Sequence, residues 1–207
     1  MTLGVFMTMH PILQALTLPP KLWRRSEMLT LHCPIPRYTG VYAWYFRDLP
    51  VPTENCHTCE DAALLYIGVA PSCAESSATL QSRIRTHLRR DASWSTLRLT
   101  LGCLLSELLS LRLRYTGSTA RLTFGLEGED RLSAWLEEHA SLVWVESIDP
   151  WRFEQPLIEQ LLPPLNLTHN ERHPFYTDLS RLRETHRQRA RNPDAQLISA
   201  TDRRKRA

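Results

Sequence analysis

The sequence contains no apolar run that approaches the ~20 residues needed by a membrane-spanning helix. Its mildly apolar start, Met1 to Leu18, lacks the basic region and the small-residue cleavage site of a secretion signal. Five cysteines, an odd number without a framework spacing, favour reduced thiols over a disulfide scaffold. We therefore expect a cytoplasmic protein without membrane contact, and 207 residues suit one domain with terminal extensions.

A strong charge of either sign is also absent from most of the chain. The formal net charge is +3, but residues 168–207 carry ten Lys/Arg against five Asp/Glu, which leaves fifteen basic and seventeen acidic residues before them. Nearly all of these basic residues are arginines, whose planar guanidinium pairs well with phosphate. The C-terminal charge is consistent with a polyanionic partner and equally with a solvated helix that has a basic end.

The order of apolar residues and structure breakers predicts an α+β fold, with a small mixed or antiparallel sheet flanked by helices. β-branched and aromatic runs favour strands, whereas helical spacing of apolar residues and Ser or Thr caps favour helices. Residues 10–37 are predicted to be a short helix and a mostly irregular, proline-spaced lead-in, and residues 47–61 a loop insertion. Strands are predicted at 41–46, 63–68, 111–115, 121–124 and 142–148, and helices from Thr79 to about Arg90, from Ser95 onward, and at 128–140, 150–162 and 176–191.

Four stretches of the chain carry residues suited to phosphodiester chemistry. They are Gly40-Val41-Tyr42, Tyr66-Ile67-Gly68, the pair Arg83 and His87, and a run from Glu154 to Asn166. Arg83 and His87 are four residues apart on a predicted helix and therefore share one face. Cleavage of a phosphodiester requires an attacking water, a metal ion or cation that absorbs charge at the phosphate, and a stabilised leaving oxygen.

In this order the segments resemble the GIY-YIG nuclease superfamily over residues 38–167. The resemblance implies a catalytic core at 38–167, an N-terminal lead-in at 1–37, and a basic helical extension at 168–207 whose end we expect to be disordered. It also implies an endonuclease that hydrolyses DNA with Mg²⁺ or Mn²⁺. The preference for single or double strands and the oligomeric state stay open.

The resemblance gives each catalytic candidate a role. Glu154 would be the metal ligand, because a hard carboxylate oxygen suits Mg²⁺, and Asn166, twelve residues later, would brace the site. Arg83 would hold the scissile phosphate. Tyr42 would activate or orient water, and Tyr66 would position the phosphate. Without the resemblance, Glu154 would be an ordinary surface carboxylate and the two tyrosines core aromatics.

The Arg83–His87 pair resembles the restriction-enzyme branch, where the histidine is thought to assist the first tyrosine. A restriction-like, site-specific endonuclease is thus an alternative, and a homo-oligomer would then serve both strands. A non-catalytic nucleic-acid-binding protein on the same fold is a further alternative, which loss of Glu154 or Arg83 would have favoured. The sequence departs from the family in its long 47–61 insertion and in Val69–Ser72, where many members have a lysine.

Further residues are predicted to contact the nucleic acid or bind it at the edge of the site. Glycines at strand ends allow close backbone approach, and Arg98 lies at a helix N-terminus, which can bind phosphate. Capping alone, however, explains Ser95. The candidates for nucleic-acid contact are Gly40, Gly68, Arg85, Arg89, Arg98 and His173.

Two clusters have simpler interpretations. Cys56-His57-Thr58-Cys59 could chelate zinc with Cys33 or Cys73, but one Cys-x-x-Cys without a second pair favours a metal-free loop. A leucine stripe after Ser95 could be an interaction surface, although core packing is the simpler reading. Its members are Leu97, Leu101, Leu104, Leu105 and Leu108.

Overall fold

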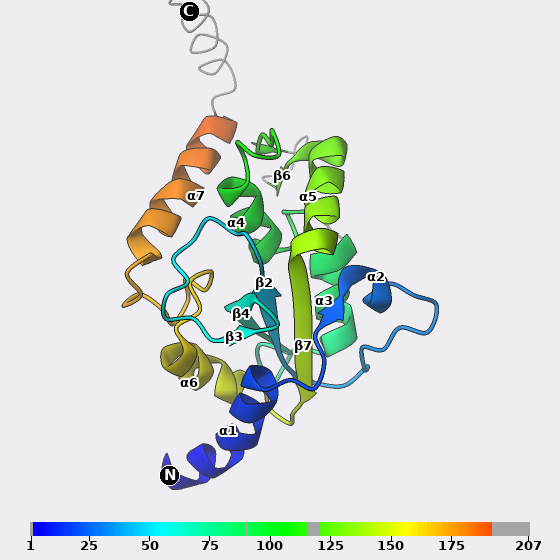
Figure 1. Cartoon of the computed structure of the whole chain (residues 1–207), viewed down its shortest axis with the longest axis vertical. Helices are drawn as coiled ribbons and strands as arrows, with labels where there is room; N and C mark the ends of the chain where they lie inside the picture. The colour runs from blue at the N-terminus through cyan, green and yellow to red at the C-terminus, as the bar shows by residue number, and fades with distance from the viewer. Residues whose placement is uncertain (1, 90, 116–120, 192–207) are drawn as a thin grey trace, which may run out of the picture.

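A five-stranded antiparallel sheet lies between two groups of helices in the computed structural model, which describes residues 2–89, 91–115 and 121–191 (Figure 1). The strand order is β1-β7-β2-β4-β3, and β5 and β6 form a separate hairpin. The strands are β1 (Trp23–Arg24), β2 (Gly40–Phe46), β3 (Thr58–Cys59), β4 (Ala62–Ala70), β5 (Arg114–Tyr115), β6 (Leu122–Thr123) and β7 (Ala140–Glu146). The helices are α1 (Thr2–Thr17), α2 (Arg25–Met28), α3 (Leu80–Arg89), α4 (Thr96–Leu104), α5 (Gly125–His139), α6 (Trp151–Leu161) and α7 (Tyr176–Arg191).

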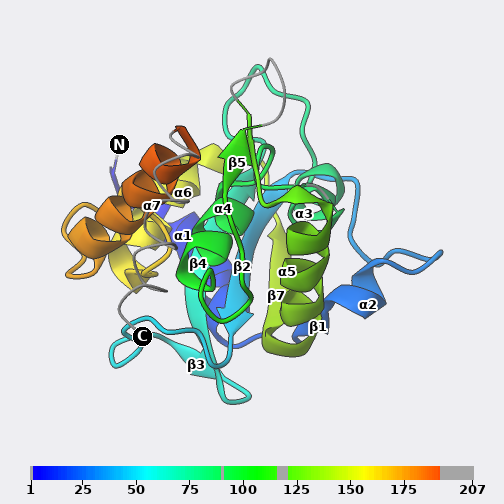
Figure 2. The same cartoon turned by 90° about the horizontal axis from the view of Figure 1, so that it is seen from above.

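Both faces of the sheet are covered, which explains why every residue of the central strand β2 is buried. Its odd-numbered residues pack with α1 and α6, and its even-numbered residues pack with α3, α4 and α5. Seen from above, α1 and α6 lie on one side of the sheet and α5 on the other (Figure 2). Helix α7 packs against α4 and β5, outside this second layer.

A β-bulge interrupts the pairing of β2 with β4. Trp44 lies opposite Tyr66 and Tyr45 lies opposite Leu64, so Leu65 is an additional residue on β4. Beyond the bulge, Ile67 packs with the α1–α6 layer, while both Leu65 and Tyr66 contact the α3–α5 layer. The bulge therefore turns the Tyr66 side chain onto the face that also carries Tyr42.

Most of the predicted elements are confirmed, including the α+β class, the strands β2 and β4 and the full extent of α7. Thr79 and Ser95 accept hydrogen bonds from the backbone N–H groups of Ser82 and Arg98, as predicted for caps. α6 ends at Leu161, where Leu162 has φ 44° and two prolines follow. None of the described helices is long and apolar enough to span a lipid bilayer.

Two predictions about helix extent are wrong. The N-terminal helix is longer than predicted, because α1 begins at Thr2; the lead-in after it is mostly irregular, as predicted, but also contains α2 and β1, which extends the sheet by pairing Trp23 with Leu142 of β7. The leucine stripe is shorter than predicted, since α4 ends at Leu104 and Leu108 is 71% exposed. The expected disorder at the C-terminal end concerns residues that lie outside the described part of the chain.

Candidate active site

The two motif tyrosines meet on the face of the sheet that is covered by α3, α4 and α5. Tyr42 from β2 and Tyr66 from β4 lie diagonally across the strand pair, with ring centroids 6.5 Å apart. Tyr42 is 1% exposed, whereas Tyr66 is half-buried. Burial raises the pKa of both phenols, the charge of the other tyrosine adds to the effect at Tyr42, and Arg83 opposes it at both. Both hydroxyls are therefore neutral at neutral pH.

The two motif glycines make this packing possible. A Cβ on Gly68 would overlap the Tyr42 hydroxyl and ring, and a Cβ on Gly40 would overlap the Val145 carbonyl oxygen and the Leu80 side chain. Both glycines are buried. Their prediction as nucleic-acid contacts is therefore wrong, because each serves close packing inside the protein.

His87 links the first tyrosine to a neighbouring helix. Its Nε2 atom lies 2.8 Å from the Tyr42 hydroxyl, and its Nδ1 atom lies 2.7 Å from the Ser95 hydroxyl at the start of α4. The ring is 1% exposed, and burial together with the charges of Arg83 and Arg98 holds its pKa well below the usual range. His87 is therefore a neutral imidazole that acts through hydrogen bonds.

Arg83 extends from α3 toward both tyrosines. It is half-buried, and although burial acts to lower its pKa, interaction with the Tyr42 and Tyr66 hydroxyls raises it overall. No ion pair joins Arg83 to any of the described residues. A half-buried guanidinium without an acidic partner is suited to an incoming phosphate, whose oxygens match its planar fork.

Glu154 approaches the same place from the first turn of α6. Its side chain is half-buried, and within the described chain no hydrogen bond or ion pair engages its carboxylate. Burial raises its pKa, and the charges of His169 and Arg83 oppose that shift. Its charge also acts on Tyr42 and Tyr66, which places all four groups around one site.

The single carboxylate of Glu154 suits a hard divalent cation that keeps several of its water ligands. In the ranges that the structure describes, no group of three or more His, Cys, Asp or Glu side chains gathers to form a metal cage. Mg²⁺ is often bound by one or two carboxylates and several waters, so a single unengaged carboxylate such as Glu154 is sufficient. Glu159 on the same helix is exposed and accepts a hydrogen bond from Gln155, so it does not contribute.

A family model of the GIY-YIG catalytic domain matches residues 40–185, which is more than half of the chain. The chain belongs to the GIY-YIG family. No curated protein and no solved structure matched it. The match confirms the resemblance seen in the motifs and supports a nuclease, and it extends beyond residue 167 into α7.

Asn166 is hydrogen-bonded to the backbone of β4 in this GIY-YIG domain. Its side chain is buried, its Oδ1 accepts from the Ile67 N–H at 2.9 Å, and its Nδ2 donates to the Ile67 carbonyl at 2.8 Å. Both bonds hold the strand segment that carries Tyr66 and Gly68. These bonds are the kind expected of a bracing residue, and the role of Asn166 in catalysis stays a prediction.

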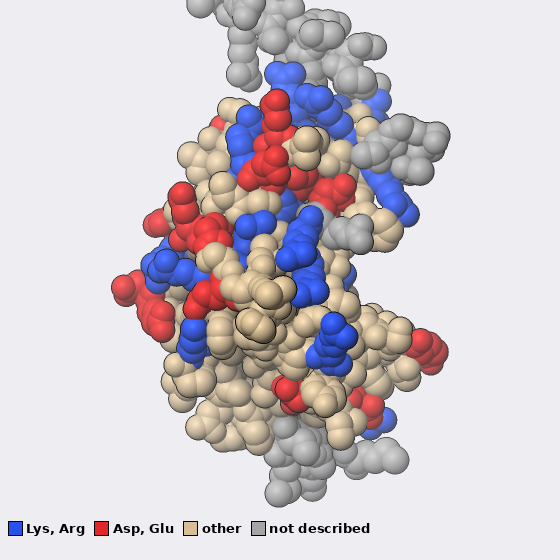
Figure 3. Space-filling view, turned by 90° about the vertical axis from the view of Figure 1, so that its right-hand side faces the viewer, with Lys and Arg blue, Asp and Glu red and all other residues tan. Residues whose placement is uncertain are grey.

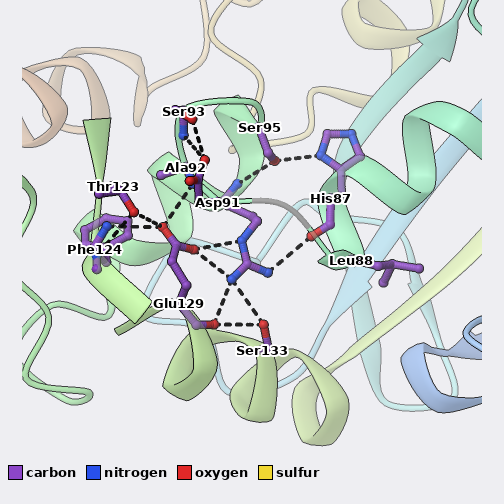
Figure 4. A network of polar contacts seen from close by, with 12 residues as sticks. His87, Leu88, Asp91, Ala92, Ser93, Ser95, Thr123, Phe124, Glu129 and Ser133 are labelled. Carbon is purple, nitrogen blue, oxygen red and sulfur yellow. Dashed lines mark hydrogen bonds and ion pairs between the residues drawn. The ribbon is translucent and has the colours of Figure 1, made fainter. Parts of the chain in front are cut away.

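Arg98 is not available to a phosphate, so its prediction as a nucleic-acid contact is wrong. It is 1% exposed, and its guanidinium forms an ion pair with Glu129 at 2.8 Å. The same group donates to the carbonyls of His87 and Glu129 and to the Ser133 hydroxyl. Figure 4 shows the surroundings of this buried network, between the loop that carries Ser95 and helix α5.

The other predicted contacts stay predictions. Arg89 is exposed on α3, and Arg85 is half-buried with an Nε atom that has no hydrogen-bond partner within the described structure. His173 is half-buried and accepts the N–H of Phe175 through Nδ1, which stabilises the turn before α7. The metal-free state of the Cys56–Cys59 loop likewise stays a prediction.

Four polar residues outside the set of named candidates also lie near the site. Ser95 contacts His87, Thr96 interacts with the Tyr66 hydroxyl, and His169 acts on Glu154. Arg183 of α7 acts electrostatically on Tyr66, and its Nε atom is buried without a hydrogen-bond partner among the described residues. His169 lies in a polar run, residues 166–175, that follows the core in the sequence and could line a substrate groove or cap the last helix.

Proposed function

We propose that this GIY-YIG protein is a metal-dependent endonuclease that cleaves DNA by direct hydrolysis of a phosphodiester bond. The observation that carries the proposal is the half-buried, unengaged carboxylate of Glu154 beside Arg83 and the two motif tyrosines. An unpaired carboxylate in a partly enclosed site is unfavourable for folding, so its presence favours a ligand that restores its partner. The family match supports a nucleic-acid substrate.

Each residue has a role that follows from its position. Glu154 would hold Mg²⁺ or Mn²⁺, and the bound ion supplies charge neutralisation at the phosphate. Arg83 would donate hydrogen bonds to the phosphate oxygens and stabilise the charge that develops in the transition state. The neutral Tyr66 hydroxyl would position the phosphate, and the neutral Tyr42 hydroxyl would orient the attacking water.

The distribution of surface charge does not by itself define a binding face. On the face that Figure 3 draws, lysine and arginine side chains lie beside aspartate and glutamate side chains. A polyanion held only by non-specific attraction would favour a more uniform patch. The proposal therefore rests on the site itself.

A restriction-like enzyme is a second candidate, favoured by the hydrogen bond between Tyr42 and His87. The residues Arg83 and His87 lie one helical turn apart on α3, as the restriction-like reading requires. Cleavage of mixed-sequence duplex DNA into discrete fragments would support this candidate. Uniform degradation of the same DNA would contradict it.

The test is incubation of the purified protein with single-stranded and double-stranded DNA in Mg²⁺, Mn²⁺ or EDTA. We expect cleavage with either metal ion and none in EDTA. Glu154→Ala should abolish cleavage and leave DNA affinity largely intact, because it removes a metal ligand and no basic side chain. Glu159→Ala, on the same helix, is the matched control. A Glu154→Ala protein that cuts at the normal rate would contradict the proposal.

A further inference from the structure

Helix α7 places an arginine on the side that faces the rest of the protein. Leu179 and His186 of this helix are buried, α7 packs against α4, and His186 Nε2 lies 3.4 Å from the Ser106 hydroxyl just after α4. Arg183 comes four residues after Leu179 and three before His186, so it lies on the same inward face. Such positions normally carry apolar side chains, and arginines that leave the surface usually pair with an acid.

Arg183 has no such acid among the described residues. Its Nε atom is enclosed by the protein without a hydrogen-bond partner, and no described carboxylate forms an ion pair with it. Burial lowers its pKa, and the charge of Arg187 adds to the effect. The buried Arg98, by contrast, is paired with Glu129. Enclosing an unpaired cation opposes folding, so the presence of Arg183 favours a ligand from outside the chain.

The end of the Arg183 side chain is open toward the active site. The residue as a whole is half-buried, and its Nη atoms, unlike Nε, are not enclosed by the described protein. The guanidinium interacts electrostatically with Cys103 of α4 and with Tyr66. Thr96, at the start of α4, contacts the Tyr66 hydroxyl, so the same helix borders both the active site and α7.

We propose that Arg183 binds a second phosphate of the nucleic-acid strand, next to the scissile phosphate that Arg83 would hold. The inference rests on the proposed nuclease function and makes Arg183 a substrate-binding residue. Arg83 from α3 and Arg183 from α7 both act on Tyr66, and neither forms an ion pair with a described residue. A strand that passes over this tyrosine would give each guanidinium a phosphate.

The balance of charge favours a strand over a single anion. Arg83 and Arg183 act on Tyr66 and Arg187 acts on Arg183, whereas Glu154 is the carboxylate that acts on the same tyrosine. One phosphodiester linkage carries one negative charge and leaves this group positive, even before a metal ion is added. Several consecutive linkages would neutralise it.

The direct test follows the Nε–H signal of Arg183 in ¹H–¹⁵N NMR spectra of the intact protein, assigned by its loss in Arg183→Lys. A short oligodeoxynucleotide is added in EDTA, so that binding is observed without metal-dependent cleavage. We expect the signal to shift as the DNA binds. An unchanged signal at saturating DNA would overturn the inference. An equal shift with inorganic phosphate at the same concentration would indicate a site for a single anion and would also overturn it.

The salt dependence of DNA binding in EDTA counts the phosphate contacts. Arg183→Met keeps the side-chain volume and removes the charge, so the magnitude of the salt slope should fall by ~0.7–0.9, and Arg83→Met should have a similar effect. The double variant should show the sum of the two losses, because two separate phosphates are involved. If it shows no more than one loss, both arginines hold the same phosphate and the inference is wrong.

Arg181→Met is the matched control, because Arg181 is exposed on the same helix. It should leave the slope unchanged, and a loss equal to that of Arg183→Met would indicate a general attraction to α7 and contradict the inference. Arg183→Met should not unfold at a lower urea concentration than the unaltered protein. A lower midpoint would show that the arginine stabilises the fold, which would also contradict it.

Cleavage kinetics separate this inference from the proposed function. Arg183→Met should raise KM several-fold and change kcat less, since the contact exists before and during the reaction. If no protein cleaves DNA but the NMR signal and the salt slope change as expected, the nuclease proposal fails and the phosphate site stands. If the unaltered protein cleaves DNA and Arg183→Met matches it in KM and salt slope, the nuclease proposal stands and the phosphate site fails.

Discussion

An arginine and a glutamate come together twice in this chain, around α3 and its neighbours. In the first region, Arg98 and Glu129 form a buried ion pair at 2.8 Å, and each also bonds to backbone groups. In the second region, Arg83 and Glu154 act on each other electrostatically, but no ion pair joins them. The same two side-chain types are fully satisfied in one region and left available in the other.

We expect this difference to separate charges that stabilise the fold from charges that serve the proposed active site. Removal of one partner from a buried ion pair leaves an uncompensated charge, which is strongly destabilising. A half-buried charge without a partner already opposes folding in the native protein and is retained where a ligand uses it. Substitutions in the Arg98–Glu129 pair should therefore lower the free energy of unfolding, and substitutions of Arg83 or Glu154 should lower the cleavage rate.

The largest effect is expected from Glu129→Gln, which leaves the buried Arg98 guanidinium without its counter-charge. We expect the free energy of unfolding to fall by about 3–5 kcal/mol, measured by urea denaturation. Glu127→Gln, an exposed change on the same helix, is the control and should have little effect. If both proteins unfold at the same urea concentration, the Arg98–Glu129 pair does not hold α4 and α5 together.

Arg83→Lys should have a large effect on cleavage and a small one on stability. The change keeps the charge but loses the planar fork, so we expect the transition state to lose roughly 2.7–4 kcal/mol, or a rate on the order of 10²–10³ lower. Arg89→Lys, an exposed change on the same helix, should mainly affect binding. A normal rate in Arg83→Lys with an inactive Arg89→Lys would move the phosphate site to the other arginine.

Glu154→Gln should stabilise the protein while it abolishes cleavage. Burial raises the pKa of Glu154 above its unfolded value, so the folded state binds the proton more tightly and stability falls as the pH rises through the raised pKa. At neutral pH the variant lacks this cost, and we expect a gain of up to about 1 kcal/mol. The gain should shrink as the pH falls and the native carboxyl becomes protonated.

Urea denaturation of both proteins between acidic and neutral pH measures this dependence. Glu159→Gln, whose position is exposed on the same helix, should show no gain at any pH. A loss of stability in Glu154→Gln would indicate that the native carboxylate has a stabilising partner, and the contrast with Glu129 would fail.

The smallest effect is expected from removal of residues 192–207, which lie outside the described chain. Arg203, Arg204, Lys205 and Arg206 should contact phosphates at most, so DNA affinity should fall for all sequences alike. Each lost contact should lower the magnitude of the salt slope of binding by ~0.7–0.9. An unchanged slope would show that the basic end does not contact DNA.

Local signals in the sequence were sufficient for much of the fold. The β-branched and aromatic run 41–46 and the capped helix after Thr79 were predicted because each pattern is complete within a few residues. The two-residue strand β1 was not predicted, since it is too short to show a period. The bulge at Leu65 also leaves no local signal, although it turns Tyr66 toward Tyr42.

Candidate site residues could be predicted where they belong to a sequence motif. They could not be predicted where their role depends on a contact with a residue far away in the sequence. Arg98 suggested a phosphate contact because it follows a helix N-terminus, but Glu129, thirty-one residues away, turns it into a buried structural residue. Ser95 was explained by capping alone, and its bond to His87 depends on the packing of α3 against α4. Such contacts arise from tertiary structure, which local patterns do not record.

Asn166 also covers part of the edge of β4. A strand with unpaired N–H and C=O groups along one side is a template on which a second chain can add. Leu65 of β4 receives the Leu165 N–H at 2.9 Å, and the Asn166 amide pairs with both backbone groups of Ile67, as a peptide unit of a neighbouring strand would. One side chain thereby occupies a stretch of strand edge beside Tyr66, where another strand could otherwise pair.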